Sequence, residues 1–250
     1  MIGMFDSGVG GLTVLRSIRQ YLPSADILYF GDIKNAPYGS KSREELSVLL
    51  VAGLKVLHER GAEKIVSACN SVSASLAISL FDALEIAPAH LIEMVGPTVA
   101  ALRDSPERIA VCATPATIRS GIYADAFRMV GKEIQNIAIE GLAGAIEFGA
   151  PEAEIKKHIE GAFTGKSDFD LLVLGCTHYP LAIEAFGTVL PDVKIFDPAE
   201  AVAIRARRQF WPQEVGDART HFLISKESQR FRDLTSSLFP NQKYTVEVLE

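Results

Sequence analysis

Short apolar runs alternate with helical stretches along almost the whole of this chain of 250 residues. The runs are apolar nearly throughout, which is typical of strands buried on both faces of a sheet. Between two of them, residues 46–57 carry leucines on one face at helical spacing. The alternation predicts an α/β fold with mostly parallel sheets and helices on both sides. The expected strands are residues 2–5, 27–30, 64–68, 108–113, 171–175, 194–196 and 221–225.

Length and two X-Pro steps bear on the domain organisation. A chain of this size allows one large domain or two of about 125 residues each. Gly96–Pro97 and Asp197–Pro198 are the candidate crossing points, because the residue before a proline disfavours helix continuation. A two-domain chain would then pass between its domains more than once, without a flexible tether.

Composition excludes several classes of function. The chain holds 31 acidic against 25 basic residues, a net charge of −6, which argues against nucleic-acid binding through a basic face. No apolar run approaches the roughly 18 residues that span a bilayer, and the N-terminus lacks the basic region of a signal peptide. The 3 cysteines cannot all pair and none forms a C-x-x-C motif, so a reduced, cytoplasmic setting is expected.

Two of the cysteines follow an apolar run and precede polar residues. Cys69 leads into Asn70-Ser71, and Cys176 leads into Thr177-His178. Ligands of open α/β sheets bind at the carboxyl ends of strands, and a helix opening after each cysteine would favour the thiolate. Burial in the core is the alternative for any free cysteine. That alternative is expected for Cys112, which lies inside residues 108–113.

A glycine-rich stretch at residues 8–11 follows the first run, and Asp6 and Ser7 directly precede it. It fits a tight strand-to-helix turn, whose backbone N–H groups could also hold a small anion. The dinucleotide fingerprint G-x-G-x-x-G fails at Thr13. Zinc is disfavoured because Cys176 and His178 supply two ligands where three or four are needed. A nucleophilic Cys176–His178 pair remains open.

Two thiols from the two halves of the chain suit the inversion of a carbon stereocentre. That reaction needs a base on one face of the carbon and an acid on the other. A thiol has an ordinary pKa of about 8.5 and can serve in either role once its pKa is tuned.

Several motifs together resemble the glutamate racemase family. The resemblance spans roughly residues 2–200, and the motifs come in the family's order. They are residues 5–16 (FDSGVGGLTVLR), 29–32 (YFGD), 37–39 (PYG), 41–42 (KS), 68–71 (ACNS), 175–181 (GCTHYPL), and Thr114 and Thr117 with Ser120 and Tyr123.

The resemblance implies two facing α/β domains with the active site in the cleft between them. It implies a first domain of residues 1–96 plus 206–250 and a second of residues 97–205. It also implies cofactor-independent interconversion of L- and D-glutamate, without pyridoxal phosphate or a metal, that supplies D-glutamate for bacterial peptidoglycan. A homodimer is expected, with a small-molecule substrate and neither nucleic acid nor membrane as a partner.

The resemblance also implies roles for individual residues. Cys69 and Cys176 would exchange the α-proton on opposite faces, assisted by Asp6 and His178 respectively. Glu147 aligns loosely with an acidic residue near the second cysteine, although an exposed helix face is its alternative. The expected substrate-binding residues are Ser7, Pro37, Tyr38, Gly39, Asn70, Ser71, Thr114, Thr117 and Thr177.

The sequence departs from the family pattern in places. Ser71 stands where a threonine is usual, which keeps the hydroxyl but loses the methyl that restrains χ1. Residues 140–147 (EGLAGAIE) replace a bulkier block, and residues 35–36 replace a basic-then-aliphatic pair. These departures leave two alternatives open: a racemase of aspartate or another small acidic amino acid, and a non-catalytic binding or regulatory protein resembling the gyrase inhibitors reported among family members.

Overall fold

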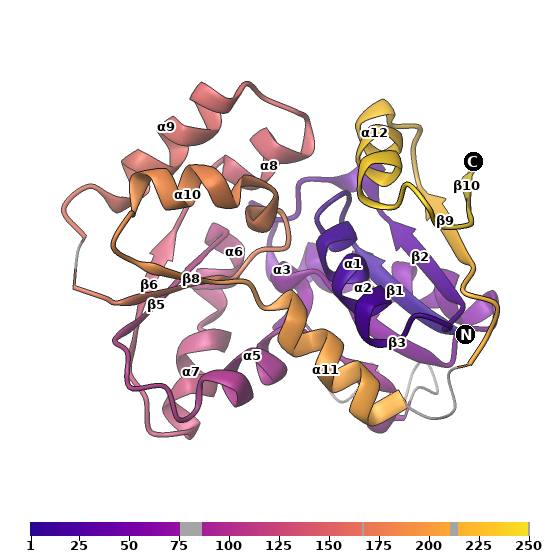
Figure 1. The fold of residues 1–250 in the computed structure, drawn as a ribbon, viewed down its shortest axis with the longest axis horizontal. Helices are drawn as coiled ribbons and strands as arrows, with labels where there is room; N and C mark the ends of the chain where they lie inside the picture. Colours follow the sequence, from indigo (N-terminus) through magenta and orange to yellow (C-terminus); the bar gives the residue numbers. More distant parts are fainter. Residues whose placement is uncertain (76–86, 167, 211–214, 250) are drawn as a thin grey trace.

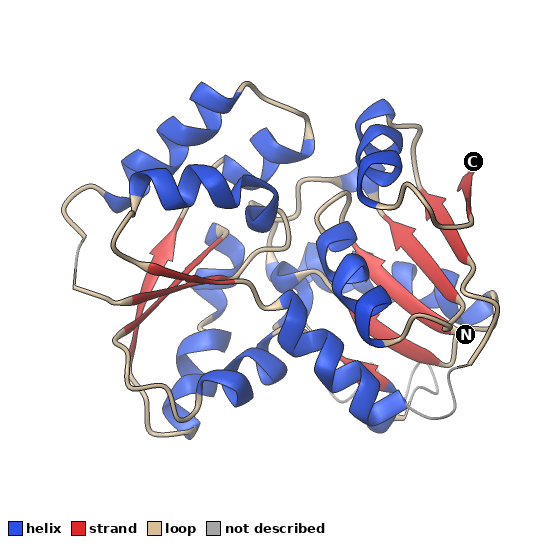
Figure 2. Ribbon diagram, in the orientation of Figure 1, coloured by secondary structure: helices blue, strands red, loops and turns tan. Residues whose placement is uncertain are grey.

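Two parallel β-sheets organise the chain in the computed structural model, which describes residues 1–75, 87–166, 168–210 and 215–249 (Figure 1). The larger sheet has the strand order β10-β9-β2-β1-β3-β4, and the smaller has the order β6-β5-β7-β8. Figure 2 shows helices on both sides of the two sheets, as the alternation predicts. The predicted α/β fold class is confirmed.

The six-stranded sheet is built from both ends of the chain. Alternate residues of its strands enter two separate cores: Ile2 and Met4 pack with α1, α11 and α12, and Phe5 packs with α2 on the other face. The strands are β1 Ile2–Asp6, β2 Ile27–Gly31, β3 Lys64–Ser67, β4 Leu91–Ile92, β9 Thr220–Ile224 and β10 Tyr244–Val248. The helices are α1 Gly11–Tyr21, α2 Arg43–Glu59, α11 Ala199–Phe210 and α12 Gln229–Leu238.

The four-stranded sheet lies in the middle of the sequence. Helices α8, α9 and α10 cover the face that carries Cys112, and α5 and α7 cover the face that carries Val111. The strands are β5 Ile109–Ala113, β6 Ile134–Ala138, β7 Leu171–Leu174 and β8 Lys194–Phe196. The helices are α5 Val95–Leu102, α6 Pro115–Ser120, α7 Ile122–Met129, α8 Leu142–Glu147, α9 Glu152–Phe163 and α10 Ile183–Val189.

The chain moves from the larger sheet to the smaller one between β4 and β5, and returns between β8 and β9. Helix α11 leads the return. Its buried residues Ala199, Val202 and Ala206 all belong to the core of the larger sheet, and the helix packs against α1. The packing therefore changes sheets near Pro198, at the start of α11, and the domain limits at 96/97 and 205/206 stay a prediction.

Each of the expected runs coincides with a strand, and Cys112 is buried in the core as expected. The leucines of residues 46–57 lie in α2, which starts with a capping box between Ser42 and Glu45. No helix within the described ranges is long and apolar enough to cross a membrane.

Candidate active site

The residues expected to carry chemistry gather at the carboxyl ends of strands from both sheets. Asp6 ends β1 and Cys69 lies two residues past β3 in the larger sheet. Thr114 follows β5, and Cys176 lies two residues past β7 in the smaller sheet. The ends of the two sheets meet directly, because the Thr177 hydroxyl donates a hydrogen bond to Asp6 Oδ2 at 3.0 Å. Parallel sheets bind ligands at this edge.

Cys69 is buried, 4% exposed, and occupies the N-cap position of the four-residue helix α3 Asn70–Ser73. Its Sγ lies 3.8 Å from Ser7 Oγ. Burial raises the pKa of this thiol, and the negative charges of Asp6 and Cys176 raise it further. The sequence predicts a helix N-terminus that favours the thiolate. The structure differs because one short helical turn offers little dipole against complete burial.

Cys176 belongs to a chain of three polar side chains. Its Sγ lies 3.8 Å from His178 Nδ1, and His178 Nε2 lies 2.6 Å from Glu147 Oε2. Burial lowers the pKa of His178, but the hydrogen bonds to Cys176 and Glu147 outweigh burial and raise it well above its ordinary value. The raised pKa favours the imidazolium form of the ring, which places positive charge beside Cys176 Sγ.

The structure excludes one alternative and corrects one expectation. Glu147 is not on an exposed helix face: it is 3% exposed and also accepts a hydrogen bond from the Val9 N–H at 2.9 Å. Cys176 does not open an α-helix, because a turn and the 3-10 segment Tyr179–Ala182 come before α10. That turn is what brings His178 back toward Cys176.

The glycine-rich turn is shaped by the close approach of residues from the other sheet. A Cβ at Gly10 would lie 2.5 Å from Thr177 Oγ1 and 2.7 Å from His178 Nδ1, and a Cβ at Gly8 would overlap the Glu147 carboxylate. The turn holds an anion through a backbone N–H, as the sequence suggests is possible. The anion it holds is the protein's own Glu147, bound by Val9.

Asp6 is completely buried and held at both oxygens. The Gly8 N–H donates to Oδ1 at 2.9 Å, and Thr177 occupies Oδ2. Burial raises the pKa of Asp6, while the His178 charge lowers it. Asp6 therefore caps the turn and also lies within electrostatic reach of Cys69, which its charge affects.

Hydroxyl groups connect the two sheets beside the thiols. Ser71 Oγ lies 3.0 Å from Thr114 Oγ1, which lies 3.1 Å from Thr117 Oγ1. The Gly39 carbonyl accepts a hydrogen bond from the Ala116 N–H at 2.9 Å. The structure thus places Ser71, Thr114, Thr117 and the loop of Gly39 together.

Asn70 begins α3 directly after Cys69 and is 3% exposed. Its Oδ1 accepts a hydrogen bond from the Tyr123 hydroxyl at 2.6 Å. Its Nδ2 is buried and has no hydrogen-bond partner among the residues that the structure describes. The site therefore contains an unused donor beside a thiol.

Comparison with known proteins identifies the family. The profile of the family described as Asp/Glu/Hydantoin racemase matches residues 2–206. The chain belongs to this family. The glutamate racemase of Chlorobaculum parvum is 36% identical over 93% of this chain and 90% of its own length. A glutamate racemase isoform from Bacillus anthracis superposes with a TM-score of 0.87, 29% identity, and coverage of 100% of this chain and 97% of that one.

A further solved structure, glutamate racemase from Francisella tularensis in complex with D-glutamate, has a TM-score of 0.85 and 27% identity, and covers 100% of this chain and 97% of that one. The resemblance inferred from the motifs is confirmed, and the chain is an isomerase of the amino-acid racemase class. Within the described ranges, no cluster of three or more His, Cys, Asp or Glu side chains could hold a metal ion.

One buried carboxylate of this racemase, Asp32, lies in the motif at residues 29–32 but is absent from the expected site residues. Asp32 Oδ2 accepts a hydrogen bond from the Tyr38 hydroxyl at 2.6 Å, so the phenol that was expected to hold substrate bonds to Asp32 instead. Asp32 also accepts from Asn35 and Ser225. The position of Asp32 in the sequence indicates a place at the site, because Asp32 directly follows β2 and Asp6 ends the neighbouring strand β1.

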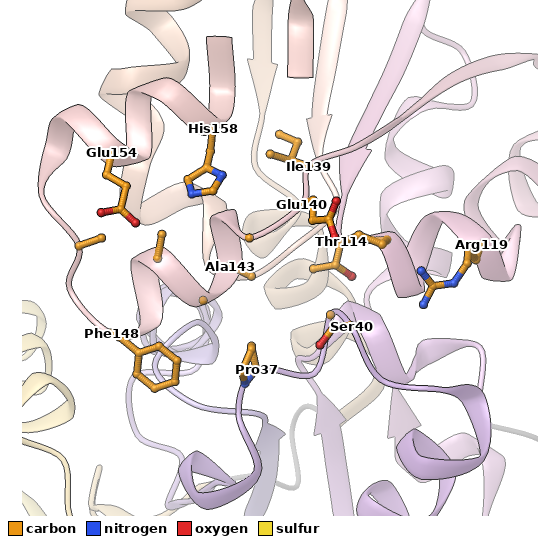
Figure 3. A pocket seen from close by; sticks show the side chains of 16 residues that line it. Pro37, Ser40, Thr114, Arg119, Ile139, Glu140, Ala143, Phe148, Glu154 and His158 are labelled. Carbon is orange, nitrogen blue, oxygen red and sulfur yellow. The ribbon is translucent and has the colours of Figure 1, made fainter. Parts of the chain in front are cut away.

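A pocket of about 650 Å³ opens beside the site, between the two sheets (Figure 3). Pro37, Gly39 and Thr114, three of the expected binding residues, line it. The opposite wall comes from residues 139–145, within which the sequence has small residues in place of the family's bulkier block. The small residues of this block therefore form one wall of the space next to the site.

Proposed function

We propose that this racemase interconverts L- and D-glutamate without a cofactor, by proton transfer between two thiols. The observation that carries the proposal is the pair Cys69 and Cys176, buried at the ends of strands from different sheets, each with its own polar partners. One thiol can then reach each face of an α-carbon held between them.

In the proposed reaction, the thiolate of one cysteine takes the α-proton and becomes a thiol. The electron pair stays on the α-carbon, which becomes planar. The thiol of the other cysteine then delivers its proton to the opposite face and becomes the thiolate. The net change is inversion of the carbon, and the reverse reaction uses the same two groups with their roles exchanged.

The surroundings of the thiols support this chemistry. The α-proton is weakly acidic, so the site must stabilise the developing negative charge with groups already in place. The His178 imidazolium, which Glu147 holds, supplies positive charge next to Cys176. The unused Asn70 Nδ2 and the hydroxyls of Ser71 and Thr117 are available to a carboxylate of the substrate.

We further propose the cellular role that this activity implies: the supply of D-glutamate for peptidoglycan, in the cytoplasm, by a homodimer. We keep the division into domains 1–96 plus 206–250 and 97–205 as part of the proposal. The remaining expected residues, Ser7, Pro37, Tyr38 and Gly39, would shape the wall of the site near Cys69.

Circular dichroism of the amino-acid pool tests the proposal. Pure L-glutamate and pure D-glutamate should each decay to zero ellipticity, and L-aspartate should change far more slowly. Cys112→Ala, which removes the core thiol, should keep the activity. Faster racemisation of aspartate than of glutamate would identify aspartate as the substrate instead. The absence of any racemisation would contradict the proposal.

A further inference from the structure

The two ends of the Asn70 side-chain amide have different surroundings. The carbonyl end accepts the Tyr123 hydrogen bond, and the NH2 end is buried without a partner in the part of the chain that the structure describes. A buried donor left unpaired costs about 1–3 kcal/mol. Such a group at the edge of an active site is therefore placed to meet an acceptor on a ligand.

Tyr123 holds the carbonyl end of the amide and leaves the NH2 end free. An asparagine side chain can present either its carbonyl or its NH2 group to a given neighbour. The Tyr123 hydroxyl donates to Oδ1, which turns Nδ2 away from the tyrosine. The reversed amide would present a carbonyl oxygen to a substrate carboxylate, and two acceptors repel each other.

Tyr123 is itself held firmly. It is fully buried on α7, in the core formed with Val99, Val111 and Phe127. An aromatic ring packed on all sides has few alternative rotamers. The position of its hydroxyl is therefore fixed by the core of the smaller sheet.

The hydrogen bond also joins the two halves of the molecule. Asn70 follows β3 of the larger sheet, whereas α7 covers the smaller sheet. The amide is consequently oriented only when the two halves approach each other. Binding of a carboxylate at Nδ2 would in turn favour that approach.

We propose that Tyr123 is a positioning residue that points Asn70 Nδ2 at a carboxylate of the substrate and couples carboxylate binding to domain closure. The inference rests on the proposed function in one respect, because it takes the carboxylate to be that of glutamate. Tyr123 does not touch the reacting atoms, so its effect is on substrate binding.

Steady-state kinetics of Tyr123→Phe test the inference. Removal of the hydroxyl leaves the ring in place and frees the amide to turn. KM for both enantiomers should rise about five- to ten-fold, the size of one lost hydrogen bond, while kcat stays within about two-fold, as for uniform binding. Asn70→Ala should raise KM as well, and adding Tyr123→Phe to it should cause no further rise.

The matched control is Tyr179→Phe, which removes another buried phenol from the smaller sheet. Its hydroxyl donates to the Ile139 carbonyl at 3.3 Å. KM should stay at the wild-type value in this variant. An equal rise of KM in Tyr179→Phe, an unchanged KM in Tyr123→Phe, or additive effects of Tyr123→Phe and Asn70→Ala would overturn the inference.

Calorimetric binding of glutarate separates this inference from the proposed function. Glutarate carries two carboxylates and has no stereocentre, so its binding does not depend on racemisation. Tyr123→Phe should weaken glutarate binding by the same factor by which it raises KM. If the wild type fails to racemise glutamate but shows this loss, the proposed function fails and the role of Tyr123 stands; equal affinity in both proteins overturns the role of Tyr123.

Discussion

The two thiols of the site have different partners at the residue scale. Cys176 lies beside the His178 imidazolium, whose other ring nitrogen is hydrogen-bonded to Glu147. Cys69 lies beside the Ser7 hydroxyl and near the Asp6 carboxylate. Negative charge is therefore stabilised at Cys176 and opposed at Cys69. Burial and the Asp6 charge raise the pKa of Cys69, so we expect Cys69 as the thiol in the resting enzyme.

Replacement of Glu147 tests the role of this buried carboxylate. Glu147→Gln keeps the shape of the side chain but removes the charge that keeps His178 protonated. We expect kcat/KM for glutamate to fall about a hundred-fold, within the range for a group that supports acid–base catalysis. Glu160→Gln, which neutralises an exposed carboxylate on α9, should have wild-type kinetics. Full activity in Glu147→Gln would contradict the assigned role.

The raised pKa of His178 predicts a pH-dependent stability. The unfolded histidine has a pKa of about 6.5, and the folded one is higher. The stabilisation from the His178–Glu147 pair is thus fully present below about pH 6.5 and is lost as pH rises through the folded value. Urea unfolding of wild type and His178→Asn should show a stability difference that shrinks from pH 6 upward. A difference that is constant or grows would contradict this sign.

At the scale of elements, the sequence predicts the central strands and one edge strand, β8, but misses the edge strands β4, β6 and β10. Strands such as β1 and β7 are buried along their whole length and read as apolar runs. Strands β6 and β10 are edge strands with partly exposed residues, so their sequences carry no such run. The short β4 is also missing from the prediction, because two residues give no pattern.

The close packing of the turn at residues 8–11 against Glu147 predicts the effect of adding a side chain at Gly8. Gly8→Ala places a methyl group where the Glu147 carboxylate lies. We expect overpacking to lower the free energy of unfolding by about 1–3 kcal/mol and to reduce kcat sharply, because Glu147 must move from His178. Gly161→Ala is the control: a Cβ there, inside α9, meets nothing within 4 Å, and alanine favours a helix. Equal effects of the two substitutions would contradict the steric explanation.

At the scale of the whole molecule, the site is complete only where the two sheets meet. Asp6 with Thr177, Val9 with Glu147 and Ser71 with Thr114 are hydrogen-bonded pairs of residues from opposite sides. Motif resemblance could name most of these residues, but no local pattern states which of them pair across such separations. The Asp32–Tyr38 bond and the free Asn70 amide are likewise consequences of tertiary packing.

The closed arrangement predicts slow access to the thiols. Cys69 is 4% exposed and Cys176 is 5% exposed, so a small alkylating agent must wait for the two halves to separate. We expect iodoacetamide to modify both thiols much more slowly than a free cysteine, and saturating D-glutamate to slow the reaction further. Mass spectrometry of the modified peptides measures both rates. Modification at the rate of free cysteine, unaffected by glutamate, would show that the halves are normally apart.

The central claim is that two thiols transfer protons on opposite faces of glutamate, and hydrogen exchange in D2O tests it most directly. L- and D-glutamate are each incubated with wild type, Cys69→Ser and Cys176→Ser, with Cys112→Ala as the control, and NMR follows the α-position. Wild type and Cys112→Ala should place deuterium in the product enantiomer, and each of the other two variants should lose racemisation. Racemisation at the wild-type rate in Cys69→Ser or Cys176→Ser would contradict the two-thiol account.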